Sequence, residues 1–590
     1  MKRKHVLAAL VLVLLAGCAG APRPPAPTTP LPQARADEIR ALISGGSYLQ
    51  ALAKINGIQQ QGIEVPDLES LSTQASADFS RAFKAAIDSK KYQDAIRLLD
   101  SARALGQPQI AGTWTEKSLL GEIASAQEAS GDKVLGLLSR LHMLSLGDAA
   151  EQDYDSAVAA AAAVGNRAVV RSLAAAMKER GFAVPASDDA ESSPSFPRMI
   201  SGTVTILVDR GIKVEKGVGY ADRVIGSGFF IDKRGYILTN HHVIESEVDP
   251  KYKGYSRLFI RLSESPAGER IPAKVVGYDK TFDLALIKTE ITPDYIFGGW
   301  SGQTLTPGDR IFAIGSPAGL EKTITSGIIS AMGRRLLQVG DSMQVDVPLN
   351  PGNSGGPLLN EKGDLIGIVF AGMPQFPGLN FAVPYTWVEK ALPALFKGGP
   401  AVHSWLGMAV AETEKGLEVI YSVPDEPAAQ AGISSGDMIE TLNGKPFKKL
   451  GEIQEEVLRH SPPSLVTVGV RRGSASQNVL VCLSARPDEP IDVALKRDAR
   501  DNVLYPLFGM QLENVGSFLW KGDYVVKRVT QGSIADESGI SPDDPLTIQD
   551  WQVDTDKGYA MLQVVIKKKK AGFIESAIQI AAYLETDNFI

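Results

Sequence analysis

The chain has 590 residues, of which 44% are hydrophobic and 22% charged, and its formal net charge is -7 at pH 7. These values are typical of a globular protein long enough for several domains, and without a dominant basic stripe we do not expect nucleic acid as a main partner. Only two cysteines occur, which excludes a disulfide framework and a cysteine-rich zinc site.

The first residues have the pattern of an export signal. Basic residues at positions 2–4 precede an apolar stretch, Val6 to Leu15, which is too short to span a bilayer as a mature helix. The stretch is followed by Ala16-Gly17-Cys18, and this ending resembles the cleavage site of a bacterial lipoprotein signal. An ordinary signal peptide with an incidental cysteine is the alternative.

The lipoprotein resemblance implies a protein of the bacterial cell envelope that is held to a membrane by lipid. Residues 1–17 would be removed and the thiol of Cys18 acylated, and more than one acyl chain gives a firm anchor. Ala19 after the cysteine favours the periplasmic face of the outer membrane. Residues 18–36 are rich in proline, alanine and threonine, which is typical of a semi-extended tether.

Residues 37–182 are predicted to form α-helical hairpins. Apolar residues recur at helical spacing, and Gly131-Asp132 and Gly165-Asn166 provide turns between helix-like segments. A weak repeat, in which Ser47-Tyr48-x-x-Ala51-Leu52 matches Lys91-Tyr92-x-x-Ala95-Ile96, resembles tetratricopeptide-like (TPR-like) hairpins. The domain is either a protein-docking surface or a spacer that holds the next domain off the membrane, and a fold alone does not decide between them.

The composition and the spacing of apolar residues change after this helical region. Residues 183–197 have the acidic residues, serines and prolines of a linker. Over residues 198–398, short β-branched and aromatic runs alternate with glycine-rich turns. Because no helical pattern separates each pair of runs, this segment predicts an all-β sandwich or barrel.

Within the β region, the stretch Gly352-Asn353-Ser354-Gly355-Gly356-Pro357 places a serine on a glycine-rich turn. A serine hydroxyl is a weak nucleophile, so it needs a base to take its proton and a third group to orient that base. Two adjacent histidines, His241 and His242, follow an apolar run upstream, and Asp283 opens another apolar run between them and the serine. These residue types indicate nucleophilic catalysis by serine.

These segments resemble the trypsin-like serine proteases, and more closely the bacterial HtrA/Deg branch, with histidine, aspartate and serine in the same order. The branch-specific matches are Gly226-Ser227-Gly228-Phe229, Gly235 to Asn240, Ile314 to Pro317, Thr325 to Ser330, Asn350 to Leu358 and Asn380 to Pro384. The resemblance implies a trypsin-like all-β double barrel and a serine endopeptidase that needs no cofactor and no metal.

Carried over residue by residue, the resemblance also implies the roles of the site residues. Ser354 would be the nucleophile, His242 the general base, and Asp283 the group that orients and stabilises the imidazolium. The backbone N–H groups of Gly352 and Ser354 would form the oxyanion hole.

The sequence contains alternative candidates for two of these roles, the general base and the aspartate that orients it. His241 is the rival base, although the side chain of an adjacent residue should point elsewhere. Asp279 and Asp294 are the rivals of Asp283, although neither opens an apolar strand.

The family's specificity-pocket positions correspond to Leu349, Ala371 and Gly372. None of these residues is an acid, and this disfavours cleavage after lysine or arginine. We therefore expect a preference for small to medium apolar side chains on the amino side of the cut.

Residues 400–487 resemble an HtrA-type PDZ domain. Its series of signals is Pro427-Ala428, Ala431-Gly432, Gly436-Asp437 and Asn443-Gly444. Such domains add a peptide strand to a sheet edge, while the amides of one loop capture a terminal carboxylate. The loop would consist of Trp405, Leu406, Gly407 and Met408. A PDZ fold that only packs against the protease is the alternative.

The same order of signals recurs weakly near the end of the sequence. Phe508-Gly509-Met510 and Gly539-Ile540 match positions of the first PDZ segment, so residues 495–590 are predicted to form a second, divergent PDZ-like domain. Cys482 lies in an apolar run of the first PDZ segment and is predicted to be a small core residue.

Taken together, the residues favour an envelope-anchored serine endopeptidase that cleaves unfolded or damaged envelope proteins, with peptide C-termini bound by the first PDZ segment. A non-proteolytic chaperone or peptide-binding scaffold on the same architecture is the alternative, although no triad residue is lost. A scaffold whose helical domain recruits partners is a third interpretation. The family resemblance and the aromatic segment Ser195-Phe196-Pro197 further predict a homotrimer.

Overall fold

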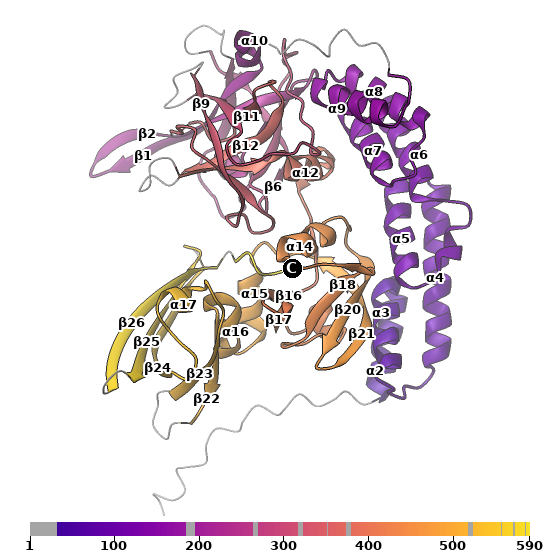
Figure 1. The fold of residues 1–590 in the computed structure, drawn as a ribbon, viewed down its shortest axis with the longest axis vertical. Helices are drawn as coiled ribbons and strands as arrows, with labels where there is room; N and C mark the ends of the chain where they lie inside the picture. Colours follow the sequence, from indigo (N-terminus) through magenta and orange to yellow (C-terminus); the bar gives the residue numbers. More distant parts are fainter. Residues whose placement is uncertain are drawn as a thin grey trace, which may run out of the picture. The chain divides into compact units, whose positions relative to one another are not determined.

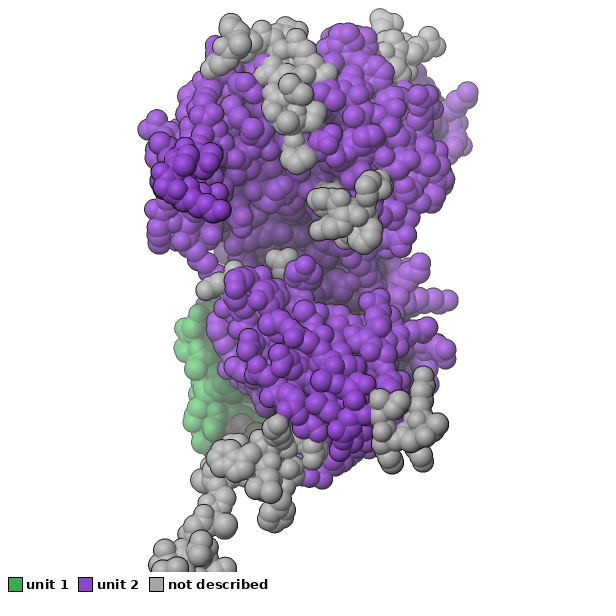
Figure 2. Space-filling view, turned by 90° about the vertical axis from the view of Figure 1, so that its left-hand side faces the viewer, with its two compact units in different colours: residues 1–78 green, residues 79–590 purple. Residues whose placement is uncertain are grey.

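The computed structural model describes residues 32–184, 195–262, 269–316, 323–350, 352–372, 379–516, 523–555, 557–569, 573–584 and 586–590. The predicted signal peptide, Cys18, most of the tether and most of the 183–197 linker lie outside these residues. The chain divides into two compact units, residues 1–78 and 79–590, which are green and purple in Figure 2.

The first unit is helical in its described part. It contains α2 (Pro32–Ser44), α3 (Tyr48–Gln60) and the beginning of α4 (Leu68–Asp88). Helices α2 and α3 pack against each other and bury small and branched apolar side chains, among them Ala36, Ile39, Leu52 and Ile55. The described part of helix α2 includes Pro32 to Ala36, which were predicted to belong to the tether. Proline is tolerated in the first turn of a helix because the N–H that it lacks has no partner there.

The second unit begins with the rest of α4 and continues as a series of helices. These are α5 (Tyr92–Ala104), the short η1 (Pro108–Ala111), α6 (Glu116–Ala129), α7 (Lys133–Ser145), α8 (Glu151–Ala163) and α9 (Arg167–Glu179). Consecutive helices from α5 to α9 contact one another (Figure 1). Gly131 and Gly165 make the α6–α7 and α8–α9 turns with φ of 86° and 68°. The predicted helical hairpins are confirmed, whereas their assignment as TPR-like stays a prediction.

Residues 203–400 form two antiparallel sheet systems. The first is an eight-stranded sheet in the order β14-β6-β7-β3-β2-β1-β4-β5, and the second is a closed barrel in the order β10-β13-β12-β11-β8-β9. The strands of the sheet are β1 (Thr203–Glu215), β2 (Val218–Asp232), β3 (Tyr236–Thr239), β4 (Arg257–Leu262), β5 (Ile271–Pro272), β6 (Lys274–Asp279), β7 (Leu284–Lys288) and β14 (Gly399–Pro400), of which only β14 runs parallel to its neighbour. The barrel strands are β8 (Arg310–Gly315), β9 (Thr323–Arg334), β10 (Ser342–Val345), β11 (Pro357–Asn360), β12 (Leu365–Gly372) and β13 (Asn380–Pro384).

One apolar core joins the two sheet systems. Phe229 and Leu284 of the sheet belong to the same buried cluster as Ile314 and Ile368 of the barrel. Helix α12 (Tyr385–Lys397) closes this cluster with its buried apolar face. Two shorter helices, α10 (Phe196–Ser201) and α11 (His241–Val248), precede β1 and follow β3. The joint core fixes the two systems against each other, so residues from both can contribute to one site.

The predicted PDZ segments form two further sheets (Figure 1). The first contains β15 (Ser404–Trp405), β16 (Met408–Thr413), β17 (Gly416–Ser422), β18 (Met438–Leu442), β19 (Lys445–Pro446), β20 (Ser464–Arg472) and β21 (Ala475–Ala485), with helices α13 (Pro427–Gln430) and α14 (Leu450–Val457). Helices α15 (Pro490–Arg497) and α16 (Arg500–Phe508) lead to the second sheet of β22 (Met510–Asn514), β23 (Asp523–Val529), β24 (Pro545–Asp554), β25 (Tyr559–Lys569) and β26 (Phe573–Tyr583), with α17 (Ile534–Glu537). As predicted, Cys482 is buried, and burial raises the pKa of its thiol to about 12.

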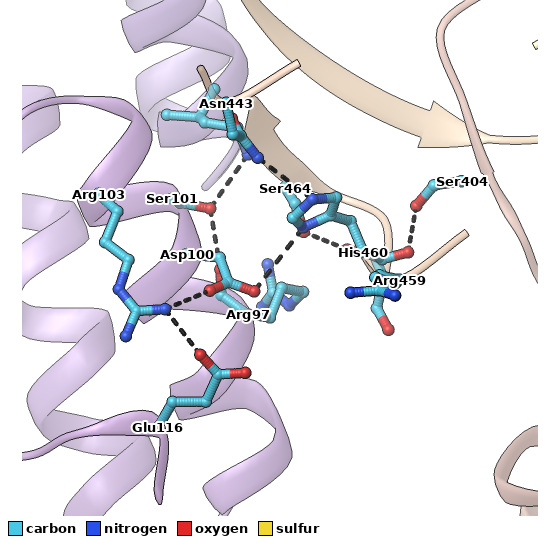
Figure 3. Close-up of polar contacts among 12 residues, drawn as sticks. Arg97, Asp100, Ser101, Arg103, Glu116, Ser404, Asn443, Arg459, His460 and Ser464 are labelled. Atoms are coloured by element: carbon cyan, nitrogen blue, oxygen red, sulfur yellow. Dashed lines mark hydrogen bonds and ion pairs between the residues drawn. The ribbon is translucent and has the colours of Figure 1, made fainter. Parts of the chain in front are cut away.

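Helix α5 packs along the first residues of β20 in the first PDZ segment. The neighbouring strand β18 pairs with β20 only from Val468 onward, so it does not cover these residues. The Ser101 hydroxyl accepts a hydrogen bond from the Leu465 N–H (3.0 Å), and an Arg97 guanidinium nitrogen donates to the Pro463 carbonyl (2.6 Å). Figure 3 shows this side of α5 facing His460, whose ring lies 3.7 Å from the Asp100 carboxylate. A helix of the N-terminal half therefore satisfies a backbone N–H of the sheet that the neighbouring strand leaves free.

None of the helices in the described part of the chain combines the length and the apolar character that crossing a bilayer requires.

Candidate active site

His242 and Asp283 are brought together by the pairing of two strands. Strand β3 pairs with β7 in antiparallel register, so the residues after Thr239 lie beside the residue before Leu284. Asp283 adopts a left-handed backbone conformation (φ 53°), which is tolerated by aspartate better than by most residues and turns its carboxylate toward α11. One carboxylate oxygen lies 2.7 Å from His242 Nδ1, and the other accepts the His242 backbone N–H at 2.9 Å. The ring is thus held by the same residue that fixes its main chain.

The environment of this pair favours a basic imidazole. Burial of His242 lowers its pKa, but the hydrogen bond and the negative charge of Asp283 outweigh burial, and the net pKa is raised above 6.5. The His242 side chain keeps 44% of its surface exposed and that of Asp283 only 19%. The imidazole can therefore reach a substrate, while the carboxylate behind it is shielded from water.

The rival residues lie elsewhere. His241 is buried, stacks on Tyr278 with ring centroids 5.3 Å apart, and has its pKa lowered by burial. The buried Asp279 carboxylate accepts a 2.8 Å hydrogen bond from His403 and two from backbone N–H groups. Asp294 is exposed. The geometry gives these residues packing or surface roles and leaves His242 with Asp283.

Ser354 sits on a loop that is tied to the neighbouring sheet by Ser227. The Ser227 N–H donates to the Ser354 carbonyl (2.7 Å), and the Ser227 hydroxyl donates to the Gly352 carbonyl (2.6 Å). Gly355 follows with φ of 86°, and a Cβ atom there would lie 2.1 Å from the Ser227 carbonyl oxygen, so only glycine fits. Ser227 is a positioning residue that sequence reasoning missed, although its Gly-Ser-Gly-Phe motif was visible.

The N–H groups expected to form an oxyanion hole are available. Gly352 has φ of 106°, a region that residues with a Cβ rarely adopt. Within the described residues, neither the Gly352 N–H nor the Ser354 N–H donates a backbone hydrogen bond, whereas the Asn353 N–H between them donates to Asn350. Two donors are left for a ligand at this turn.

The segments that carry the serine and the histidine meet, but within the described residues the two side chains share no hydrogen bond. A Cβ atom on Gly226 would lie 2.6 Å from the side chain of Val243 and 3.3 Å from the Ser354 carbonyl oxygen, so both segments meet at that glycine. The Ser354 hydroxyl instead points to the Phe370 carbonyl at 3.5 Å, and no hydrogen bond joins it to His242 in the described part of the chain. Such contacts are often long without substrate.

The three positions expected to form the specificity pocket lie in or next to the barrel. Leu349 is partly buried against the barrel core, in the segment after β10. Ala371 and Gly372 end β12 and pair with Phe381 and Asn380 of β13. They are placed next to Phe370, whose carbonyl faces the Ser354 hydroxyl.

The predicted carboxylate loop of the first PDZ segment converges on one acceptor. The N–H groups of Leu406, Gly407 and Met408 all donate to the main-chain oxygen of Ile590, at 3.2, 2.9 and 3.4 Å. Trp405 is buried and pairs with Ser484 in the sheet, so it supports the loop rather than donating to this oxygen.

Comparison with known proteins agrees with this arrangement. Family models match for a trypsin-like peptidase domain at residues 226–368, a PDZ domain at 404–483, a TP0546 family PDZ domain at 491–584 and a domain of unknown function at 32–126. A relative named as a probable periplasmic serine endoprotease, DegP-like, from Marinomonas sp. is 32% identical over 341 residues, which are 55% of this chain and 70% of the relative. One of the same name from Pseudomonas fluorescens is also 32% identical, with the same coverage.

Solved structures give matches of lower similarity. An HtrA-type protease, AlgW with decapeptide, is 26% identical with a TM-score of 0.43, covering 50% of this chain and 99% of that one. The serine endoprotease from Yersinia pestis is 30% identical with a TM-score of 0.40, covering 50% and 100%.

The peptidase-domain match and the PDZ matches define a trypsin-like serine endopeptidase that carries PDZ domains. The chain belongs to the family of DegP-like serine endoproteases. The predicted fold class and enzyme class are thereby confirmed, while the lipoprotein anchor and the TPR-like assignment stay predictions.

Proposed function

We propose that Ser354, His242 and Asp283 are the catalytic triad of this endopeptidase. The observation that carries the proposal is the 2.7 Å contact between His242 Nδ1 and Asp283, beside a serine loop in which the Gly352 and Ser354 N–H groups donate no backbone hydrogen bond to the residues that the structure describes. Asp283 keeps the proton on Nδ1, so the lone pair of Nε2 is free to accept the proton of the serine hydroxyl.

The reaction follows from these positions. Ser354 Oγ turns from the Phe370 carbonyl to His242, gives its proton to Nε2 and bonds to the scissile carbonyl carbon. The carbonyl oxygen becomes an anion that the N–H groups of Gly352 and Ser354 stabilise, each by about 3–4 kcal/mol. The imidazolium then donates its proton to the leaving amine. A water molecule, deprotonated by His242, hydrolyses the ester and restores the serine.

The proposed substrates of the enzyme are unfolded or damaged proteins of the cell envelope. The relatives' names place them in the periplasm, which supports an envelope location for this chain as well. The loop from Trp405 to Met408 would receive peptide C-termini, because its amides converge on a main-chain oxygen. Acylated Cys18 would hold the protein at the periplasmic face of the outer membrane.

The proposal also includes the oligomeric state, which we expect to be a homotrimer. The Phe196 side chain is 40% exposed beside its contact with Phe312, and such an aromatic group at the start of the β region fits a homotrimer interface. Light scattering of the protein without residues 1–18 tests this, and a monomer at micromolar concentration would contradict it.

The deciding experiment compares wild type and Ser354→Ala on casein as an unfolded substrate. Removing one partly exposed hydroxyl leaves the fold intact but removes the covalent step, so cleavage should fall by about 10⁴-fold or more. Ser326→Ala is the matched control, since Ser326 is an exposed serine of β9. Circular dichroism verifies folding, and near-wild-type turnover by folded Ser354→Ala would overturn the triad.

A further inference from the structure

The end of the sequence lies as an added strand on the first PDZ sheet. Strand β16 is the edge of that sheet, and the segment 586–590 occupies its free side: the Ile590 N–H donates to the Met408 carbonyl (2.9 Å) and the Val410 N–H donates to the Asn588 carbonyl (2.9 Å). Phe589 forms an antiparallel bridge with Ala409. The C mark in Figure 1 lies at this place, beside α14 and β16. This is the mode in which PDZ domains hold peptide ligands.

The side chains of the segment are buried as a ligand's would be. Ile590 is 3% exposed and belongs to the core cluster of the first PDZ segment, together with Leu406 and with Ile453 of α14. Phe589 is fully buried and meets Tyr421 edge to face, with ring centroids 6.4 Å apart. The pocket that would accept the last side chain of a foreign peptide is therefore filled.

Polar contacts tie the same segment to other parts of the second unit. The buried Gln454 side chain of α14 donates to the Asp587 carbonyl (2.7 Å) and accepts the Gly340 N–H (3.3 Å), which lies between β9 and β10. The Asp587 carboxylate lies 3.8 Å from the Arg335 guanidinium of the same barrel segment. The Asn588 amide donates to the Pro506 carbonyl of α16 (2.8 Å).

We propose that residues 586–590 are a built-in ligand of the first PDZ groove, and that peptides from other proteins must displace this segment in order to bind. The inference rests on the proposed peptide-binding function of the Trp405–Met408 loop and adds its regulation. Displacement would also remove the contacts of the segment with Arg335, which follows β9, and with Gln454, which accepts the Gly340 N–H.

The physical consequence is competition within one molecule. A ligand attached to its own site has an effective concentration of about millimolar, so a free peptide of similar intrinsic affinity binds far more weakly than it would to an empty groove. Its apparent affinity is reduced by the fraction of molecules whose groove is open.

The test measures binding of a fluorescent peptide, Thr-Asp-Asn-Phe-Ile, which copies the segment, to the full-length protein carrying Ser354→Ala. This substitution prevents cleavage, so binding is read independently of catalysis. Adding Ile590→Asp places a charge in the apolar pocket and should release the segment, tightening peptide binding by about tenfold or more. Ile590→Ala is a milder second variant, expected to act in the same direction, and Ile590→Val is the control that should leave binding weak.

Amide hydrogen exchange at Leu406 to Val410 gives a second readout. These amides should exchange slowly in the parent protein, faster in Ile590→Asp, and slowly again when the peptide is added. A peptide with a C-terminal amide should bind less well, because the loop amides lose a charged acceptor.

Equal affinity of the peptide for the parent protein and for both pocket variants, or equally fast exchange in all of them, would overturn the inference while leaving peptide binding intact. Failure of the peptide to bind any of the proteins would overturn both the inference and the proposed role of the loop. Neither result touches catalysis, which the casein experiment decides.

Discussion

His242 Nδ1 and the Asp283 carboxylate lie 2.7 Å apart, and this contact sets the charge state of the proposed base. Burial alone would lower the pKa of His242, yet Asp283 raises it above 6.5. A protonated imidazole cannot accept the serine proton, so activity requires a pH above this raised pKa.

The acid limb of the pH profile should therefore lie above pH 6.5, with kcat/KM falling as the pH drops through the pKa of His242. Hydrolysis of a small reporter peptide from about pH 5 to about pH 9 measures it. Asp283→Asn removes the contribution that raises the pKa but not the burial, so the residual activity should have its limb at lower pH. An unmoved limb in this variant would show that another group titrates.

The adjacent histidines provide a matched pair of variants. His242→Ala should reduce kcat/KM by about 10⁴-fold or more, because no base remains. His241→Ala should keep most of the activity and lower stability by at least about 0.5–1.5 kcal/mol, because its stack on Tyr278 contributes this much beyond the burial of the ring, which is also lost. Kinetics and thermal unfolding of both variants check this, and inactivity of folded His241→Ala would exchange the two roles.

Cleavage sites should follow small to medium apolar residues. The expected pocket positions, Leu349, Ala371 and Gly372, offer no carboxylate to pair with a lysine or arginine side chain. Mass spectrometry of the fragments from unfolded casein identifies the residue before each cut. Fragments that mostly end in lysine or arginine would contradict this pocket.

The contact between α5 and β20 should contribute to the stability of the protein. Ser101→Ala leaves the buried Leu465 N–H without its 3.0 Å acceptor, so the free energy of unfolding should fall by about 1–3 kcal/mol. Ser125→Ala on α6 is the control, since the hydroxyl of this exposed serine donates to the Gly121 carbonyl of its own helix. Denaturant unfolding of the two variants compares them. Equal midpoints would mean that the α5 contact contributes nothing to stability.

Much of the proposed site could be predicted from short stretches of sequence. The glycine-flanked Ser354, the histidine after an apolar run and the aspartate that opens a strand are local patterns, because strand ends and tight turns place side chains where chemistry can use them. The alternatives His241 and Asp279 could be ranked but not dismissed from the sequence, since their burial depends on Tyr278 and His403, which come from other elements. The role of Ser227 was invisible for the same reason: its partner, Gly352, is 125 residues away.

The sequence by itself determined the order of the helical, protease and PDZ segments and the residues proposed for the catalytic loop, because apolar periodicity, turn residues and motif spacing are properties of neighbouring positions. Only the tertiary structure decided which partners these residues meet. The β3–β7 register joins His242 to Asp283, α5 supplies Ser101 to a free strand N–H, and Ile590 fills the groove of the first PDZ domain. Each of these contacts links residues far apart in the chain, and its formation depends on the burial and backbone hydrogen bonding of whole elements, which leave no local trace in the sequence.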